Sequence, residues 1–219
     1  DKLRELYVHG YYHTDKRGRP IYIEKTKEMR ITDCFSAYSE EELVTYHVQS
    51  YERLINVIFP ACSKVAGHRI EQTLTIMDLN GVNALKLYVG KTKAFIKLAT
   101  DIAQDHYPEI LGNMYIINAG YLFSGLWALV KPFINPKTQK KISIESGSAK
   151  KKLLELVDED KLPDFLGGSC KDNLATDPGP FKEALDLSRK NKTLFYHDPK
   201  VVEQYYLMDE EKQKKAEDK

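Results

Sequence analysis

The stretch Met114–Val130 reads MYIINAGYLFSGLWALV and carries no charged residue, although 30% of the 219 residues in the chain are charged. A helix that spans a membrane needs about 20 consecutive apolar residues. This run is shorter than that, and Asn118 and Gly120 interrupt it. We therefore predict two shorter elements joined by a turn, namely a strand that ends at Asn118 and a helix that begins near Tyr121.

The rest of the chain repeats this alternation of strand and helix. Short runs rich in β-branched and aromatic residues predict strands at Pro20–Lys25, Thr73–Asp78, Tyr115–Asn118 and Lys141–Glu145. Helical patterns occupy Ser39–Phe59, Asn83–Gln104, Tyr121–Phe133 and Ser148–Val157. Ser39 precedes three glutamates and is a suitable N-cap. Strands that alternate with helices predict an α/β domain with a largely parallel sheet.

The predicted helix Tyr121–Phe133 has one wide apolar face. At 100° per residue, its large apolar side chains fall within an arc of about 160°, and the opposite face is small rather than charged. These side chains are Leu122, Phe123, Leu126, Trp127, Leu129, Val130 and Phe133. Two interpretations stay open at this point: a helix whose apolar face packs in the core, or a movable lid whose apolar face touches lipid.

The net charge, the first residues and the cysteine positions argue against several classes of protein. The chain has 33 basic and 32 acidic residues, whereas a nucleic-acid-binding protein usually has a basic excess, so we expect no nucleic-acid partner. The first residues are charged and do not resemble a signal peptide. Cys34, Cys62 and Cys170 lie far apart without a CxxC pair, which predicts reduced cytosolic thiols and neither a disulfide framework nor a zinc site.

Motifs of the common enzyme classes are also missing from the sequence. It contains no GxSxG, P-loop, GxGxxG or HExxH pattern, so we expect neither catalysis nor a cofactor. Asp78 ends a predicted strand, where α/β proteins often place catalytic residues, but a hydrogen bond to the following LNG turn is the simpler expectation. His9 and His13 lie in a region that resembles a loop with no acidic ligand nearby, so we expect no metal site there.

Five motifs occur in a characteristic order. They are PACSKVAGH (Pro60–His68), TLTIMDLNG (Thr73–Gly81), YPEILGNMYIINA (Tyr107–Ala119), LFSGLWALVKPFINPKTQKKI (Leu122–Ile142) and LPDFLGG (Leu162–Gly168). Together they resemble the CRAL-TRIO lipid-binding domain, and most of all the branch of the eukaryotic phosphatidylinositol/phosphatidylcholine transfer proteins. The resemblance runs from about Tyr11 to Phe181.

The resemblance implies a sheet floor, helical walls and a gate helix that together enclose a hydrophobic pocket for one phospholipid. The gate helix corresponds to Tyr121–Phe133, with Leu122, Phe123, Leu126, Trp127, Val130 and Phe133 as the gate residues. Residues 1–181 would form the lipid-binding domain, and residues 182–219 a C-terminal extension with a polar tail. By this resemblance, we expect the helical unit that usually precedes the HTDKRGRP region to be absent from the chain.

The resemblance also assigns positions to two lipid headgroups. Phosphatidylinositol positions correspond to Glu109, Thr138 and Lys141, and phosphatidylcholine positions to Tyr22, Tyr51, Thr73, Thr75 and Tyr107, with Tyr11 or Tyr12 as one more. The residue types suit these ligands, since choline prefers aromatic faces and hydroxyls bind phosphate. The alternatives are that the tyrosines and threonines only pack a sheet and that Lys141 is a solvated lysine.

By resemblance, the expected function is that of a monomeric cytoplasmic carrier, peripheral to Golgi or endosomal membranes. It would exchange phosphatidylinositol and phosphatidylcholine at membrane surfaces and present phosphatidylinositol to phosphoinositide kinases. Three alternatives remain. The domain could bind another hydrophobic ligand such as a sterol, squalene, tocopherol or a retinoid; it could be a hydrolase; or it could be an interaction domain of a longer protein that transfers nothing.

Overall fold

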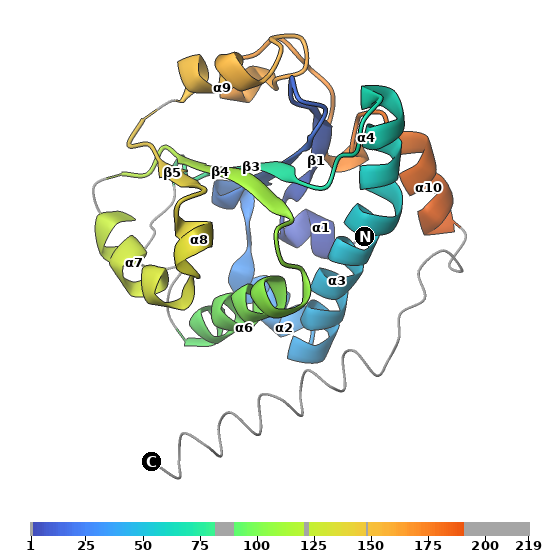
Figure 1. Cartoon of the computed structure of the whole chain (residues 1–219). Coiled ribbons are helices and arrows are strands. Elements are labelled where there is room, and N and C mark those ends of the chain that lie inside the picture. Colours follow the sequence, from blue (N-terminus) through green and yellow to red (C-terminus); the bar gives the residue numbers. More distant parts are fainter. Residues whose placement is uncertain (1, 82–89, 121–122, 148, 191–219) are drawn as a thin grey trace.

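The computed structural model describes residues 2–81, 90–120, 123–147 and 149–190, and its centre is a five-stranded sheet (Figure 1). The strands lie in the order β1-β2-β3-β4-β5. They are β1 (His9–Thr14), β2 (Pro20–Lys25), β3 (Thr73–Asp78), β4 (Leu111–Ile117) and β5 (Ile142–Ile144). Only the β1–β2 pair is antiparallel among these strands. The predicted α/β fold with a mostly parallel sheet is confirmed.

The sheet differs from the prediction at three strands, of which β5 is only one residue shorter at each end than the predicted Lys141–Glu145. β2 and β3 have the predicted bounds, but β1 forms where a loop was expected. β4 begins at Leu111, earlier than predicted, because Gly112 conceals its pattern. A Cβ atom at Gly112 would lie 2.5 Å from Nη1 of Arg19 and 2.8 Å from the carbonyl oxygen of Thr73. Only glycine allows the strands to approach this closely.

The long helix that follows β2 is longer than predicted and contains an irregular turn. α3 (Glu40–Arg53) begins at Ser39, whose hydroxyl accepts from the backbone N–H of Glu42 in a complete capping box. A π-helical turn (Leu54–Ile58) then leads into α4 (Phe59–Ala66). Pro60 explains this turn, since proline cannot donate a backbone hydrogen bond and its ring displaces the preceding turn.

The other predicted helices are present within the described residues. They are α6 (Gly90–His106), α7 (Phe123–Val130), which continues as a 3₁₀ turn at Lys131–Phe133, and α9 (Lys150–Leu156). Residues 82–89, 121–122 and 148, on which parts of these predictions fall, lie outside the described residues. Shorter helices are α1 (Lys2–Leu6), α2 (Ile31–Ala37), α8 (Pro136–Gln139) and α10 (Lys182–Lys190).

The stretch Met114–Val130 therefore divides between β4 and α7, as predicted. Asn118, just after the strand, has a positive φ of 54° and turns the chain toward the helix. Among the described helices, none combines the length and apolarity that crossing a bilayer requires.

The sheet separates two layers of helices. α9 lies on one face, while α3, α6 and α7 lie on the other (Figure 1). On the α9 face, Leu74 and Ile76 of β3 pack with Leu153 and Val157 in a fully buried core. At the end of the described chain, Leu185 of α10 packs against the π-helical turn. The predicted polar tail falls within residues 191–219, outside the described part.

Candidate functional site

The two threonines of β3 lie on the sheet face opposite α9. Side chains alternate along a strand, so Thr73 and Thr75 point away from the core that Leu74 and Ile76 join. Their hydroxyl oxygens are 3.3 Å apart and both side chains are buried. Two hydroxyls thus stand together on the face toward α3, α6 and α7.

Register partners extend this face across the sheet. One row runs through Tyr11, Tyr22, Thr75, Met114 and Ile142, which are paired strand by strand. The row is aromatic and polar on β1, β2 and β3, and apolar on β4 and β5.

A parallel row has the same division. It runs through His9, Glu24, Met77, Ile116 and Ile144. Ionisable side chains again occupy β1 and β2, and only thioether and aliphatic side chains follow. This face of the sheet therefore changes from polar at β1 and β2 to apolar at β4 and β5.

Tyrosine rings gather at the polar half of this face. The rings of Tyr11 and Tyr22 are 5.2 Å apart between centroids. Those of Tyr51 and Tyr107 stack at 4.5 Å, and the Tyr107 hydroxyl donates to Glu52 at 2.7 Å. Burial and the charge of Glu24 raise the pKa of Tyr51 to about 12. Four of the predicted tyrosine positions thus lie close to one another.

Tyr12, the other candidate beside Tyr11, lies on the opposite face. Its ring is fully buried in the α9 core, and its hydroxyl donates to the backbone carbonyl of Asp172 at 3.1 Å. Of the two alternatives, the structure places only Tyr11 beside the predicted residues.

Glu24 joins this group, and the sequence prediction missed it. Its carboxylate accepts from the hydroxyls of Tyr7 at 2.5 Å and Tyr22 at 3.2 Å. Burial raises the pKa of Glu24, and these two hydrogen bonds act in the opposite direction. The signal was a charged residue two positions after Tyr22 in an apolar strand, which places both on one face.

His9 completes the polar half beside Glu24. Its Nδ1 lies 2.7 Å from the carbonyl of Tyr7 and must donate to it, so its Nε2 accepts from the Tyr46 hydroxyl at 2.9 Å. Burial is the main reason that the pKa of His9 is lowered to about 4. The imidazole is therefore neutral at physiological pH.

Four of the six predicted gate residues pack over the apolar half. Phe123 and Trp127 of α7 stack with ring centroids 6.5 Å apart, and they cluster with Val130, Phe133 and Ile116. Leu122, and the side chain of Leu126, lie outside the described part of the structure. Gly125, Ala128 and Lys131 are exposed, as the helical periodicity predicts for the opposite face.

Gln104 of α6 holds the chain just after α7 through two hydrogen bonds. Gln104 donates to the carbonyl of Phe133 at 3.0 Å and accepts from the backbone N–H of Asn135 at 2.5 Å. α7 is therefore tied to the rest of the fold at its C-terminal end.

The predicted phosphatidylinositol residues are joined by contacts of their own. Lys141 donates to the Glu109 carboxylate at 2.8 Å, and the Lys141 backbone N–H donates to the carbonyl of Thr138 at 2.9 Å. The hydrogen bond from Lys141 and its charge lower the pKa of Glu109. Glu109 is the more exposed partner and has a positive φ of 64°.

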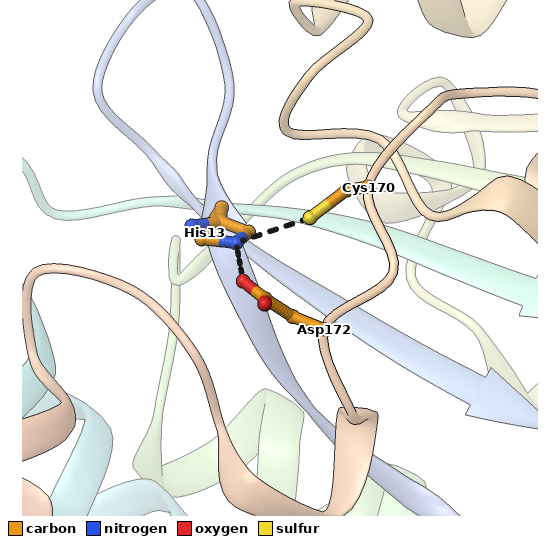
Figure 2. A group of neighbouring side chains, drawn as sticks. All are labelled: His13, Cys170 and Asp172. Carbon is orange, nitrogen blue, oxygen red and sulfur yellow. Dashed lines mark hydrogen bonds and ion pairs between the residues drawn. The ribbon is translucent and has the colours of Figure 1, made fainter.

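Two further predictions concern catalysis and metal binding. Asp78 accepts from the backbone N–H of Asn80 at 2.9 Å, as expected, and from the Asn118 side chain at 2.7 Å. The expectation about His13 was wrong in one respect, because an acidic residue does lie beside it. Asp172 and Cys170 both approach its ring (Figure 2). A separation of 159 residues from Asp172 hid this proximity in the sequence.

The chain is similar in sequence to known proteins. A family model for the CRAL/TRIO domain matches residues 4–168. The phosphatidylinositol/phosphatidylcholine transfer protein SFH12 of Arabidopsis thaliana is 42% identical over 194 residues, which are 86% of this chain and 36% of that protein. The SEC14 cytosolic factor of Yarrowia lipolytica is 35% identical over 185 residues, 83% of this chain and 37% of that protein.

A solved structure, that of Sfh5, matches 80% of this chain and 58% of its own with a TM-score of 0.46 and 18% identity. The chain spans well under two thirds of the length of SFH12 and of the SEC14 cytosolic factor. The family match, by contrast, covers most of the present chain. The chain belongs to the CRAL/TRIO domain family.

Proposed function

We propose that the protein carries single molecules of phosphatidylinositol and phosphatidylcholine between membranes. The observation that carries this proposal is the divided face of the sheet. Hydroxyls, tyrosine rings and a carboxylate occupy β1, β2 and β3, whereas Met114, Ile116 and Ile142 face α7. A phospholipid has the same division between headgroup and acyl chains.

Enclosing the acyl chains is the main energetic task of such a carrier. Each CH₂ group exposed to water costs about 0.8 kcal/mol. Two acyl chains of about 15 methylenes each would cost on the order of 25 kcal/mol if fully exposed. The apolar cluster of Phe123, Trp127 and Ile116 suits this task.

The polar half suits choline phosphate. A quaternary ammonium has no hydrogen to donate and binds aromatic faces, which Tyr22 and Tyr51 offer. Glu24 adds a carboxylate as the counter-charge. Thr73 and Thr75 present adjacent hydroxyls that can donate to the phosphate.

The inositol headgroup has different needs and a different candidate site. Lys141 supplies a cation for the phosphate, and the Glu109 carboxylate can accept from ring hydroxyls. Their ion pair holds both side chains at one place, next to Thr138. Two headgroup regions on one domain allow two lipids to compete for one set of acyl contacts.

α7 serves as the lid in this proposal. Opening exposes the carrier's own apolar lining, and doing so against a bilayer avoids that cost. Trp127 and Phe123 suit the interface because aromatic rings tolerate it. The carrier acts as a monomer at Golgi or endosomal surfaces and presents phosphatidylinositol to phosphoinositide kinases. The lipid cargo is the only non-protein molecule that this exchange needs.

The test is native mass spectrometry of the protein purified from cells, together with exchange against vesicles of phosphatidylinositol or phosphatidylcholine. We expect a bound diacyl phospholipid that the vesicles replace. Thr75→Val keeps the shape and removes one hydroxyl, so phosphatidylcholine transfer should fall about tenfold, the equivalent of one hydrogen bond of about 1.4 kcal/mol. Phosphatidylinositol transfer should change less.

Thr32→Val, at an exposed position of α2, is the matched control and should leave both transfers unchanged. Trp127 is the single tryptophan of the chain, so its fluorescence reports directly on α7. Brominated lipid in the acceptor vesicles should quench it. A protein that stays empty with both lipids, or that retains a sterol instead, would overturn the proposal.

A further inference from the structure

Three side chains that can bind metal ions meet beyond the β1 edge of the sheet, outside the lipid-facing side. Nε2 of His13 lies 2.7 Å from the Asp172 carboxylate and 3.5 Å from Sγ of Cys170 (Figure 2). All three ligand atoms lie within 4.8 Å of one another. They come from β1 and from the loop after α9, which the fold alone brings together.

The contacts exclude a catalytic relay of the cysteine–histidine–aspartate type. In such a relay the carboxylate orients one ring nitrogen and the nucleophile uses the other. Here the thiol and the carboxylate both approach the same nitrogen, Nε2. Convergence of a nitrogen, a sulfur and an oxygen on one point is what a bound cation requires.

The distances are close to those of tetrahedral zinc ligation. Zinc–nitrogen bonds of about 2.0 Å and zinc–sulfur bonds of about 2.3 Å place the two ligand atoms roughly 3.6 Å apart. The observed separation of Nε2 and Sγ is 3.5 Å. The Asp172 carboxylate oxygen must move about 0.7 Å farther from Nε2 of His13 to reach the usual separation of two zinc ligands. Asp172 has the freedom to do so because its side chain is 51% exposed.

The backbone beneath these side chains is held in place on both sides. His13 has a positive φ of 48°, and its N–H donates to the carbonyl of Pro178 at 2.6 Å. The backbone N–H of Cys170 donates to the carbonyl of Leu162 at 3.1 Å, and the carbonyl of Asp172 accepts from the Tyr12 hydroxyl. Such support reduces the entropy that ligands lose when they bind an ion.

The glycine pair of LPDFLGG explains why the cysteine loop is so tight. A Cβ atom at Gly168 would lie 1.9 Å from the carbonyl oxygen of Leu162, so only glycine fits there. Its N–H donates to the carbonyl of Pro163 at 3.0 Å. The loop that carries Cys170 therefore has little freedom to move its thiol away from His13.

We propose that His13, Cys170 and Asp172 form a Zn²⁺ site with a water molecule as the fourth ligand. Thiolate and imidazole are ligands that zinc accepts, whereas Mg²⁺ and Ca²⁺ prefer oxygen alone. The partial exposure of His13 and Asp172 leaves room for the water. The ion cross-links the first strand of the sheet to the loop after α9, and so stabilises the edge of the sheet.

Cobalt titration of the full chain tests this site. The protein is stripped of metal, kept reduced with a non-thiol reagent and titrated with Co²⁺ and then with Zn²⁺. We expect one Co²⁺ per chain with a thiolate-to-cobalt charge-transfer band, which Zn²⁺ displaces. Zn²⁺ should also raise the melting temperature.

Three variants locate the site. Cys170→Ser should remove the charge-transfer band, and Asp172→Asn should weaken Zn²⁺ binding at least tenfold. His13→Asn should do the same without backbone strain, because asparagine tolerates a positive φ. Since Asp172 is half-exposed, its variant remains informative if another variant fails to fold.

Cys34→Ser and His68→Asn are the matched controls, because Cys34 packs in a different cluster, with Leu3, Leu6 and Leu43, and His68 is an exposed histidine. Both should bind Co²⁺ as the unmodified chain does. The proposal is overturned if the unmodified chain shows no charge-transfer band, if the band persists in Cys170→Ser, or if a control variant weakens zinc binding as much as Asp172→Asn. None of these readouts depends on lipid transfer.

Discussion

Neighbouring residues of β3 face two different environments. Leu74 and Ile76 are fully buried against α9 in a mostly aliphatic core. Thr73 and Thr75, one position away in each case, face tyrosines, Glu24 and the apolar cluster under α7. One strand therefore contributes to two layers with unlike chemistry.

The difference shows how this fold separates stability from recognition. The buried core on the α9 face is mostly aliphatic, and the hydroxyl of its Tyr12 donates to the carbonyl of Asp172, so this core serves folding. The opposite face holds Glu24 and Tyr22, whose pKa values burial raises. Ionisable groups in such surroundings are costly to keep and are typical of functional sites.

Removing packing from the α9 face should have the largest effect. Ile76→Ala creates a cavity in the buried core, and we expect it to lower the free energy of unfolding by about 2–5 kcal/mol. Exchange per folded molecule should stay close to that of the unmodified protein. Urea denaturation, with exchange measured on the folded fraction, checks both expectations.

The matched control for this change is Ile144→Ala, since Ile144 lies on β5 with 38% of its surface exposed. Ile144→Ala should lower the free energy of unfolding by less than half as much as Ile76→Ala does. If Ile76→Ala slowed exchange of the folded protein as strongly as Thr75→Val does, the two faces would not be separate in function.

Lowering the pH should reduce the free energy of unfolding by an intermediate amount, through His9 on the sheet face opposite α9. His9 has its pKa lowered from 6.5 to about 4, so the unfolded chain takes up the proton first as the pH falls. Its contribution to stability is complete above pH 6.5 and is lost between pH 6.5 and about 4. The loss is about 3 kcal/mol at most, because one pKa step corresponds to about 1.4 kcal/mol.

Urea denaturation at pH 7 and at pH 4.5 measures this loss. His9→Gln should make the stability depend less on pH, although His47, whose pKa is also lowered to about 4, leaves part of the dependence. His68→Gln, at an exposed position, is the control. An unchanged pH dependence in His9→Gln would show that the imidazole is not held neutral by its surroundings.

The exposed headgroup pair should have the smallest effect on stability. Lys141→Ala removes an ion pair with a solvent-exposed partner, Glu109, and such pairs contribute little to folding. We expect an almost unchanged melting temperature. Phosphatidylinositol transfer should fall several-fold while phosphatidylcholine transfer changes little, because the variant removes the cation from one headgroup region only.

Lys140→Ala changes the neighbouring exposed lysine and should affect neither lipid. Transfer of both lipids between vesicles is the measurement. Equal losses for the two lipids in Lys141→Ala would count against a separate phosphatidylinositol region.

Local patterns were enough to predict most of the architecture. β2 and β3 have the predicted bounds, and Ser39 caps α3 as expected, because alternation and capping depend only on nearby residues. The same reasoning divided Met114–Val130 into strand and helix. It failed at β1, whose HGYYHT sequence becomes a strand only because it pairs with β2.

The candidate site divides in the same way. The i, i+2 spacing of Thr73 and Thr75 determined that both hydroxyls share a face, and the order of motifs determined the family. The tertiary structure decided that Tyr11 rather than Tyr12 joins them, that Tyr7 and Tyr22 enclose Glu24, and that His13 meets Cys170 and Asp172. The spacing of residues in the sequence determines which side chains share one face of a helix or strand. Contacts between distant segments depend on how the whole chain packs.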